Sequence, residues 1–192
     1  MVHFRFMTSK VFLLATTLCL GGCLGMPQSV IPVKEFELNK YLGRWYEIAR
    51  LDHSFEQGLE QVTAEYSLRK DGGVTVTNRG FSVTKKTWKE AVGKAFFVEE
   101  PSTGYLKVSF FGPFYGSYVI FELDKENYQY AFISGPDTSY LWLLARTPVV
   151  EQELLDRFVA QAKERGFPTE QISYVPQRKE DKKSLSNKEE NL

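Results

Sequence analysis

The sequence has few of the side chains that carry metal, redox or nucleophilic chemistry. Its 192 residues include two cysteines and two histidines. A zinc cluster needs three or four ligands, and a catalytic relay needs a nucleophile, a base and a group that orients the base. We therefore expect no metal centre, no cofactor and no catalytic residue.

An excess of basic residues is also absent. Lysine and arginine together number 24, and aspartate and glutamate also number 24. A nucleic-acid-binding domain normally shows a basic stripe or a strongly basic balance. The even balance predicts that nucleic acid is not a partner.

Long hydrophobic runs are missing too, because the longest one covers only residues 11–20. A transmembrane helix needs about 20 apolar residues. The run follows Arg5 and Lys10, and this arrangement is typical of a signal peptide. It predicts that residues 1–22 are removed from the mature protein.

The run ends in Leu20-Gly21-Gly22-Cys23. Small residues before a cysteine resemble the bacterial lipobox, which implies lipidation of Cys23 and attachment to a membrane. Leu24 follows instead of an aspartate, and by its resemblance to the enterobacterial sorting rule this implies the outer membrane, on the periplasmic side. Plain secretion with cleavage nearby is the alternative.

Composition divides the rest of the chain into three parts. Residues 23–34 contain glycine and two prolines, and we expect them to form a lipidated tether, whose ten central residues would reach roughly 33 Å when extended. Residues 177–192 are almost wholly charged and polar, so they are predicted to be a disordered tail. The folded domain is expected over residues 35–176.

Alternation of apolar and polar residues marks most of this domain. Residues 62–69 alternate clearly, and Asp71-Gly72-Gly73 then provides a hairpin turn. Eight such strands at hairpin spacing, with no helix between them, predict an all-β fold, an antiparallel up-and-down barrel. An amphipathic helix over about 150–165 and a short ninth strand over 172–175 follow the barrel.

Two short motifs resemble those of the lipocalins. Gly43 and Trp45 open the first strand, and alternation places Trp45, Glu47 and Ala49 on one face. Arg146 ends the eighth strand, as in the family's third motif, whereas residues 127–131 match the second motif loosely. The resemblance implies that Arg146 lies across Trp45 at the closed end of the barrel. The chain is similar to the bacterial outer-membrane lipocalins.

An eight-stranded barrel can hold one small ligand, and the resemblance implies a carrier of fatty acids or lysophospholipids. The expected ligand-binding residues mix aromatic, aliphatic and amide side chains: Tyr66, Asn78, Phe97, Val108, Phe110, Tyr118, Tyr130 and Trp142. In the sixth strand, either Tyr118 with Ile120 or Val119 with Phe121 faces inward. Basic residues near the rim, to hold a polar head group, are Arg79, Lys85 and Lys86.

The loop over residues 111–115 is unusually aromatic for a loop tip. Exposed apolar patches mark partners, membranes or ligand entrances. Three interpretations stay open: the rings fold back into the entrance, they touch a membrane, or they form a homodimer contact.

Two other functions compete with the carrier. One is a structural or partner-binding lipoprotein whose barrel is filled by its own side chains. The other is a lipid-modifying enzyme, for which the candidate groups are His53 beside Asp52, and Glu47 or Glu90 in strands. No nucleophile, base and orienting group can be assembled from them. The space above Trp45 decides between a hollow and a filled barrel.

Overall fold

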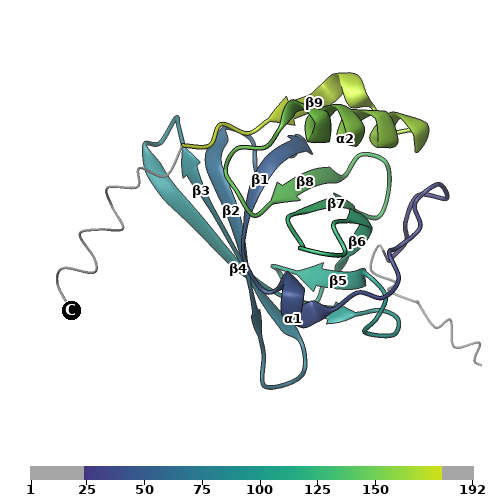
Figure 1. The fold of residues 1–192 in the computed structure, drawn as a ribbon. Coiled ribbons are helices and arrows are strands. Elements are labelled where there is room, and N and C mark those ends of the chain that lie inside the picture. The colour runs from purple at the N-terminus through teal and green to yellow at the C-terminus, as the bar shows by residue number, and fades with distance from the viewer. Residues whose placement is uncertain (1–23, 179–192) are drawn as a thin grey trace, which may run out of the picture.

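The computed structural model describes residues 24–178, which form a closed antiparallel barrel (Figure 1). The strands are β1 (Gly43–Leu51), β2 (Leu59–Leu68), β3 (Val74–Ser82), β4 (Thr87–Phe97), β5 (Tyr105–Ser109), β6 (Gly116–Leu123), β7 (Tyr130–Ser134), β8 (Leu141–Ala145) and β9 (Ile172–Tyr174). Strands β1 to β8 pair in chain order, and β1 also pairs with β8, which closes the barrel. The predicted fold class is confirmed.

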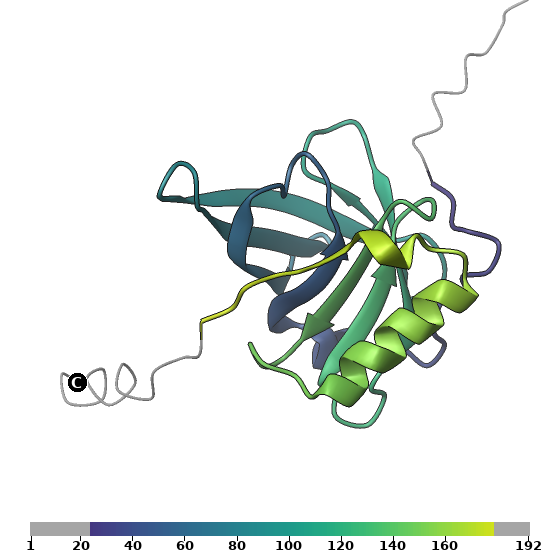
Figure 2. The same cartoon turned by 90° about the horizontal axis from the view of Figure 1, so that it is seen from above.

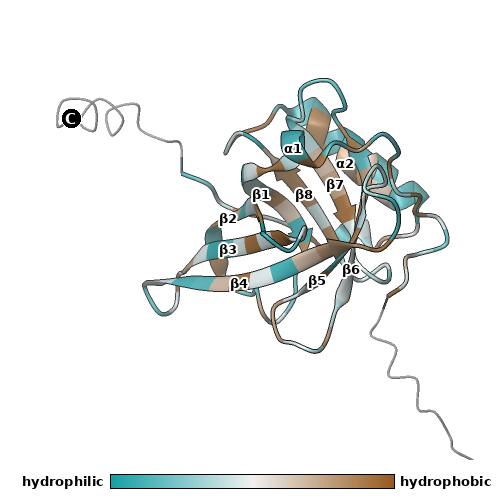
Figure 3. Ribbon diagram, turned by 90° about the horizontal axis from the view of Figure 1, so that it is seen from below, coloured by the Kyte–Doolittle hydropathy of each residue, from teal (hydrophilic) through white to brown (hydrophobic). Residues whose placement is uncertain are grey.

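Three helical segments accompany the strands: α1 (Leu38–Tyr41), α2 (Gln152–Glu164) and the 3₁₀ helix η1 (Thr169–Gln171). Helix α2 packs on the outside of the barrel through Phe158 and Ala162, which are fully buried (Figure 2). The ring centroid of Phe158 lies 5.0 Å from that of Phe132 in β7. Hydrophobic colouring runs along β7 and β8, where the outward residues meet α2 (Figure 3). Among residues 24–178, no helix is long and apolar enough to cross a membrane.

Strand β6 contributes to both hydrophobic cores. Tyr118 and Ile120 pack in the core inside the barrel, whereas Val119 and Phe121 pack in the core between the barrel and α2. Alternation along a strand allows either choice. The position of α2 decides it, because the helix covers the face that carries Val119 and Phe121.

Strand β1 differs from simple alternation. Its pairing with β8 shifts register between Glu47 and Ala49, which marks a β-bulge. A bulge adds one residue and reverses the faces beyond it. Trp45 and Glu47 share the expected face, but Ala49 packs in the outer core and Arg50 pairs with Glu47. The expectation that Ala49 shares the face of Trp45 is therefore wrong.

The closed end is built as the family resemblance implies. The guanidinium carbon of Arg146 lies 3.9 Å from the centroid of the Trp45 ring. Trp45 is completely buried, and its indole N–H donates to the carbonyl oxygen of Tyr41 at 2.7 Å. Gly43 has a φ of +89°, a left-handed conformation that favours glycine. These residues form the barrel base.

The segment expected to be a tether packs along the barrel instead. Val30 is buried, and the N–H of Val33 donates to the carbonyl oxygen of Ile120 at 2.9 Å. The Ser29 hydroxyl donates to the carbonyl oxygen of Arg165, just beyond α2. The folded domain thus begins before residue 35. Cys23 and the expected signal peptide lie outside the described residues.

The C-terminal end of the domain connects β1 and β2 where these two strands are no longer paired with each other. β1 pairs with β2 only over residues 43–46, and β9 takes its place over residues 49–51. The Gln177 side-chain amide donates to the carbonyl oxygens of Glu47 and Val62, at 2.8 and 2.9 Å. The domain therefore extends at least to Gln177, one residue past the expected boundary.

Candidate ligand cavity

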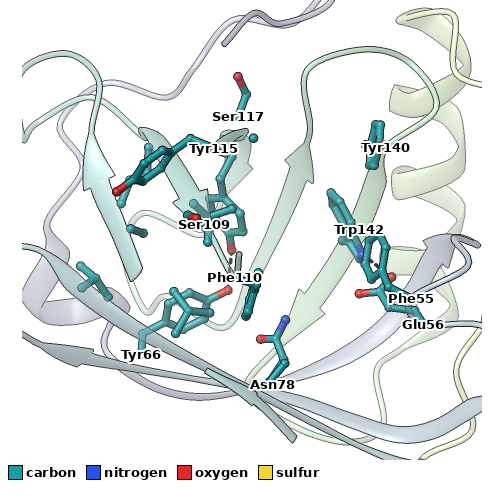
Figure 4. A pocket seen from close by; sticks show the side chains of 18 of the residues that line it. Phe55, Glu56, Tyr66, Asn78, Ser109, Phe110, Tyr115, Ser117, Tyr140 and Trp142 are labelled. Carbon is teal, nitrogen blue, oxygen red and sulfur yellow. Dashed lines mark hydrogen bonds between the residues drawn. The ribbon is translucent and has the colours of Figure 1, made fainter. Parts of the chain in front are cut away.

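The interior of the barrel holds a cavity of about 650 Å³ (Figure 4). Phe36 and Tyr41 line its deep end near the barrel base, and the loops after β1, β5 and β7 surround its mouth. This volume lies within the range of ordinary small-molecule pockets, about 300–1,000 Å³. The barrel is therefore hollow, which contradicts the interpretation that its own side chains fill it.

Six of the eight expected ligand residues line this cavity: Tyr66, Asn78, Val108, Phe110, Tyr118 and Trp142. Phe97 does not line it but packs against the interior core, with its ring centroid 6.1 Å from that of Phe36. Tyr130 faces the opposite side of the sheet, where the Arg157 guanidinium of α2 lies 4.5 Å from its ring centroid. Tyr130 was expected inside, but the inward residues of β7 are Ala131 and Ile133.

Two polar atoms of the cavity wall have no partner in the described part of the chain. These atoms are Oδ1 of Asn78 in β3 and Oγ of Ser109 in β5. Asn78 points into the pocket in Figure 4. A buried acceptor without a hydrogen bond costs about 1–3 kcal/mol. Both positions therefore favour a ligand that carries polar groups as well as an apolar chain.

Three tyrosines form a hydroxyl chain on the cavity wall. The hydroxyl of Tyr118 lies 2.7 Å from that of Tyr41 and 2.8 Å from that of Tyr66. Burial raises the pKa of all three above the usual tyrosine value. They remain neutral, so they add hydrogen-bonding capacity to the wall without adding charge.

A buried charged cluster occupies the mouth side of the barrel. Arg50 donates to Oε1 of Glu47 at 2.7 Å, to Oδ1 of Asp52 at 2.8 Å and to the carbonyl oxygen of Glu56 at 2.9 Å. The indole N–H of Trp142 donates to Oε2 of Glu56 at 3.1 Å. Figure 4 shows Glu56 and Trp142 on one side of the pocket, with Tyr66 across from them.

Burial makes two carboxylates of this cluster, those of Glu47 and Glu56, hard to ionise. Desolvation, together with the neighbouring Glu47, raises the pKa of Glu56 to about 8. Desolvation also raises the pKa of Glu47, although Arg50 opposes the change. Sequence reasoning missed Arg50 because nothing in the local alternation signals the bulge that turns its side chain inward. It missed Glu56 because this residue joins the cluster through its contact with Arg50.

The rim of the cavity is aromatic. Phe55, Phe111 and Phe114 line the mouth and are 59%, 80% and 73% exposed. Of the expected rim cations, Arg79 borders the cavity and packs over Trp88, whereas Lys85 and Lys86 do not border it. Phe111 and Phe114 stay exposed at the entrance, whereas Tyr115 of the same loop is half-buried and lines the cavity.

Three of the four groups weighed for catalysis have other partners, whereas Glu90 borders the cavity. Asp52 binds Arg50, whereas Nε2 of His53 lies 2.9 Å from the carbonyl oxygen of Ser139 and its ring stacks on Tyr140. Glu47 is bound to Arg50. Within residues 24–178, no three histidine, cysteine or acidic side chains lie close enough together to hold a metal ion.

The family model described as "Lipocalin-like domain" matches residues 36–177. The chain is a lipocalin. It is 66% identical over 167 residues to "Outer membrane lipoprotein Blc" of Vibrio cholerae, covering 87% of this chain and 98% of that protein. It is 48% identical over 151 residues to the protein of the same name in Escherichia coli K12, covering 79% and 85% of the two chains.

The structural similarity extends to much more distant lipocalin-like barrels. Insecticyanin from the tobacco hornworm superposes with a TM-score of 0.62 at 19% identity, covering 78% of this chain and 85% of that one. At that identity the likeness shows the shared fold alone.

Proposed function

We propose that this lipocalin is a membrane-anchored carrier that stores or transports fatty acids or lysophospholipids in the bacterial envelope. The observation that carries the proposal is the hollow barrel, whose mostly apolar wall contains the unpartnered polar atoms of Asn78 and Ser109. An apolar wall suits an acyl chain, and the polar atoms suit the head group of an amphiphile.

The energetics favour reversible binding. A sixteen-carbon chain gains roughly 12 kcal/mol on burial, at about 0.8 kcal/mol for each CH₂ group. Association costs about 4–15 kcal/mol, so the affinity is expected in the micromolar range. A carrier must release its lipid, and such an affinity allows release.

The proposed anchor is lipid on Cys23, in the outer membrane and facing the periplasm. Its support is the lipobox-like Leu20-Gly21-Gly22-Cys23 and the name of the Vibrio cholerae and Escherichia coli relatives, "Outer membrane lipoprotein Blc". Labelled palmitate should enter the wild-type protein and not the Cys23→Ser variant. Equal labelling of both proteins would contradict the anchor.

The binding experiment uses the mature Cys23→Ser protein, which is free of its anchor. After delipidation, it is titrated with lysophospholipid and with fatty acid and examined by native mass spectrometry. We expect one bound lipid per protein at micromolar concentration. No bound species at tens of micromolar lipid would overturn the carrier function.

The proposal assigns no catalytic residue. Its support is that Asp52 accepts a hydrogen bond from Arg50 and His53 contacts the carbonyl oxygen of Ser139, so each side chain has a partner other than its neighbour. The test is incubation of the protein with a lysophospholipid and analysis of the products. Turnover that disappears in His53→Ala or Glu47→Gln would favour the enzyme instead.

A further inference from the structure

The described chain begins at the open end of the barrel. The N–H of Gly25 donates to Oγ of Ser117, in the first residues of β6, at 3.0 Å. A Cβ added to Gly25 would lie 3.8 Å from the carbonyl oxygen of Pro136, in the loop between β7 and β8. Ser117 and Pro136 both border the cavity. The chain therefore enters the domain beside the cavity mouth.

Little chain separates the proposed anchor from this mouth. Cys23 is one peptide bond from Leu24, and consecutive Cα atoms lie about 3.8 Å apart. Beyond Gly25 the chain is held to the barrel by Val30 and Val33. Because the segment is not a free tether, a lipid on Cys23 keeps the mouth close to the membrane that holds the lipid.

The loop between β5 and β6 presents side chains that suit a bilayer surface. Phe111 and Phe114 are 80% and 73% exposed. Behind them, the amines of Lys94 and Lys107 lie 5.9 and 5.3 Å from the centroid of the Tyr115 ring. Aromatic rings enter the interface between head groups and acyl chains, while lysines extend toward lipid phosphates.

A second copy of the chain fits this surface less well. A two-fold contact uses the same patch on both partners. Pairing through Phe111 and Phe114 would therefore bring Lys94 and Lys107 of the two copies toward each other. Anionic lipid head groups instead complement the two lysines.

We propose that the cavity mouth docks directly on the phospholipid bilayer, with Phe111 and Phe114 in the interface. Lipid then passes between the membrane and the cavity without crossing open water. This inference rests on the proposed lipidation of Cys23 and gives the carrier its route of exchange.

The test uses two variants, one with a fluorescent label at the open end of the barrel and one with the label at the closed end. The full-length lipidated protein is reconstituted in vesicles of phosphatidylethanolamine and phosphatidylglycerol. Gly112→Cys carries the label at the mouth and keeps both phenylalanines, because a Cβ there meets nothing within 4 Å. Glu126→Cys carries it on the exposed turn between β6 and β7, at the closed end. In the mature protein Cys23 is blocked by lipid, so each label has one free thiol.

Lipids that carry a spin label near the head group should quench most of the emission at position 112 and shift it to the blue. The emission at position 126 should not change. Equal quenching at both positions, or stronger quenching at position 126, would overturn the proposal. An emission change at position 112 that needs no vesicles and grows with protein concentration would assign the surface to a second copy and also overturn it.

The docking and the carrier function can fail separately. Quenching at position 112 together with no lipid bound by the Cys23→Ser protein would leave the docking correct and the carrier wrong. Lipid binding without selective quenching would leave the carrier correct and the docking wrong.

Discussion

Trp142 donates the indole hydrogen bond that holds Glu56 at the mouth of the cavity, at 3.1 Å. The pKa of Glu56 in the folded protein is about 8, against the usual 4.5. Between these values the folded protein retains a proton that the unfolded chain releases. The free energy of unfolding therefore falls as the pH rises through this window and becomes constant above it.

We predict that Glu56→Gln removes this dependence and makes the protein more stable than the wild type at alkaline pH. The gain is a few kcal/mol at most, because one pKa unit corresponds to about 1.4 kcal/mol. Urea unfolding from about pH 5 to about pH 9 measures it. Glu126→Gln, on an exposed turn, is the control. Curves for Glu56→Gln and the wild type that run parallel over this range would contradict the prediction.

Asn78 tests the preference for an amphiphile. Asn78→Leu removes the buried Oδ1 that lacks a partner, so the empty protein should become more stable by about 1 kcal/mol. The same change should weaken lysophospholipid binding and spare the binding of an uncharged hydrocarbon probe. Thermal unfolding and a fluorescence displacement assay measure the two effects. Equal losses for both ligands would mean that Asn78 acts through shape alone.

Val76 tests whether the ligand occupies the cavity. Val76 lines it, and its neighbour Thr77 in β3 does not. Val76→Phe should fill the space of several methylene groups and lower the affinity for an acyl chain by about tenfold or more. Thr77→Phe, the matched control, should bind as the wild type does. Circular dichroism should show that both variants are folded. Similar affinities of the two folded variants would indicate that the ligand binds outside the barrel.

Arg146 tests the base of the barrel. Besides stacking on Trp45, it donates to the carbonyl oxygens of Lys40, Leu42 and Arg44. Lysine keeps the charge but not the planar fork. Arg146→Lys should therefore lower the free energy of unfolding by about 1–3 kcal/mol. Arg178→Lys, at an exposed arginine, should change it little. Equal stabilities of the two variants would refute the bonding role.

Local chemistry explains which features could be predicted from the sequence. Alternating residues and turn signals specify strands, and eight antiparallel strands at hairpin spacing have one simple way to close. The Gly43, Trp45 and Arg146 motif places the barrel base because the three residues act together there. Six of the eight expected cavity residues followed from the same alternation.

Other features depended on neighbours that no short pattern reports. The wrong face for Tyr130 is an example, since only the packing of α2 shows which side of β7 is outside. The bulge in β1 is another, because it depends on the register with β8 and places Arg50 beside Glu47. The packing of residues 24–34 against the barrel likewise depends on partners about 90 residues away in the chain, such as Ser117.

The sequence by itself determined the strands and their order, because these depend on periodicity and on local turns. The resemblance of Gly43, Trp45 and Arg146 to the lipocalin motifs identified the barrel base. The tertiary structure alone decided that the barrel is hollow, that its mouth carries a buried charged cluster, and that the chain enters beside that mouth. Those properties arise from side chains brought together across strands, and alternation within one strand does not specify them.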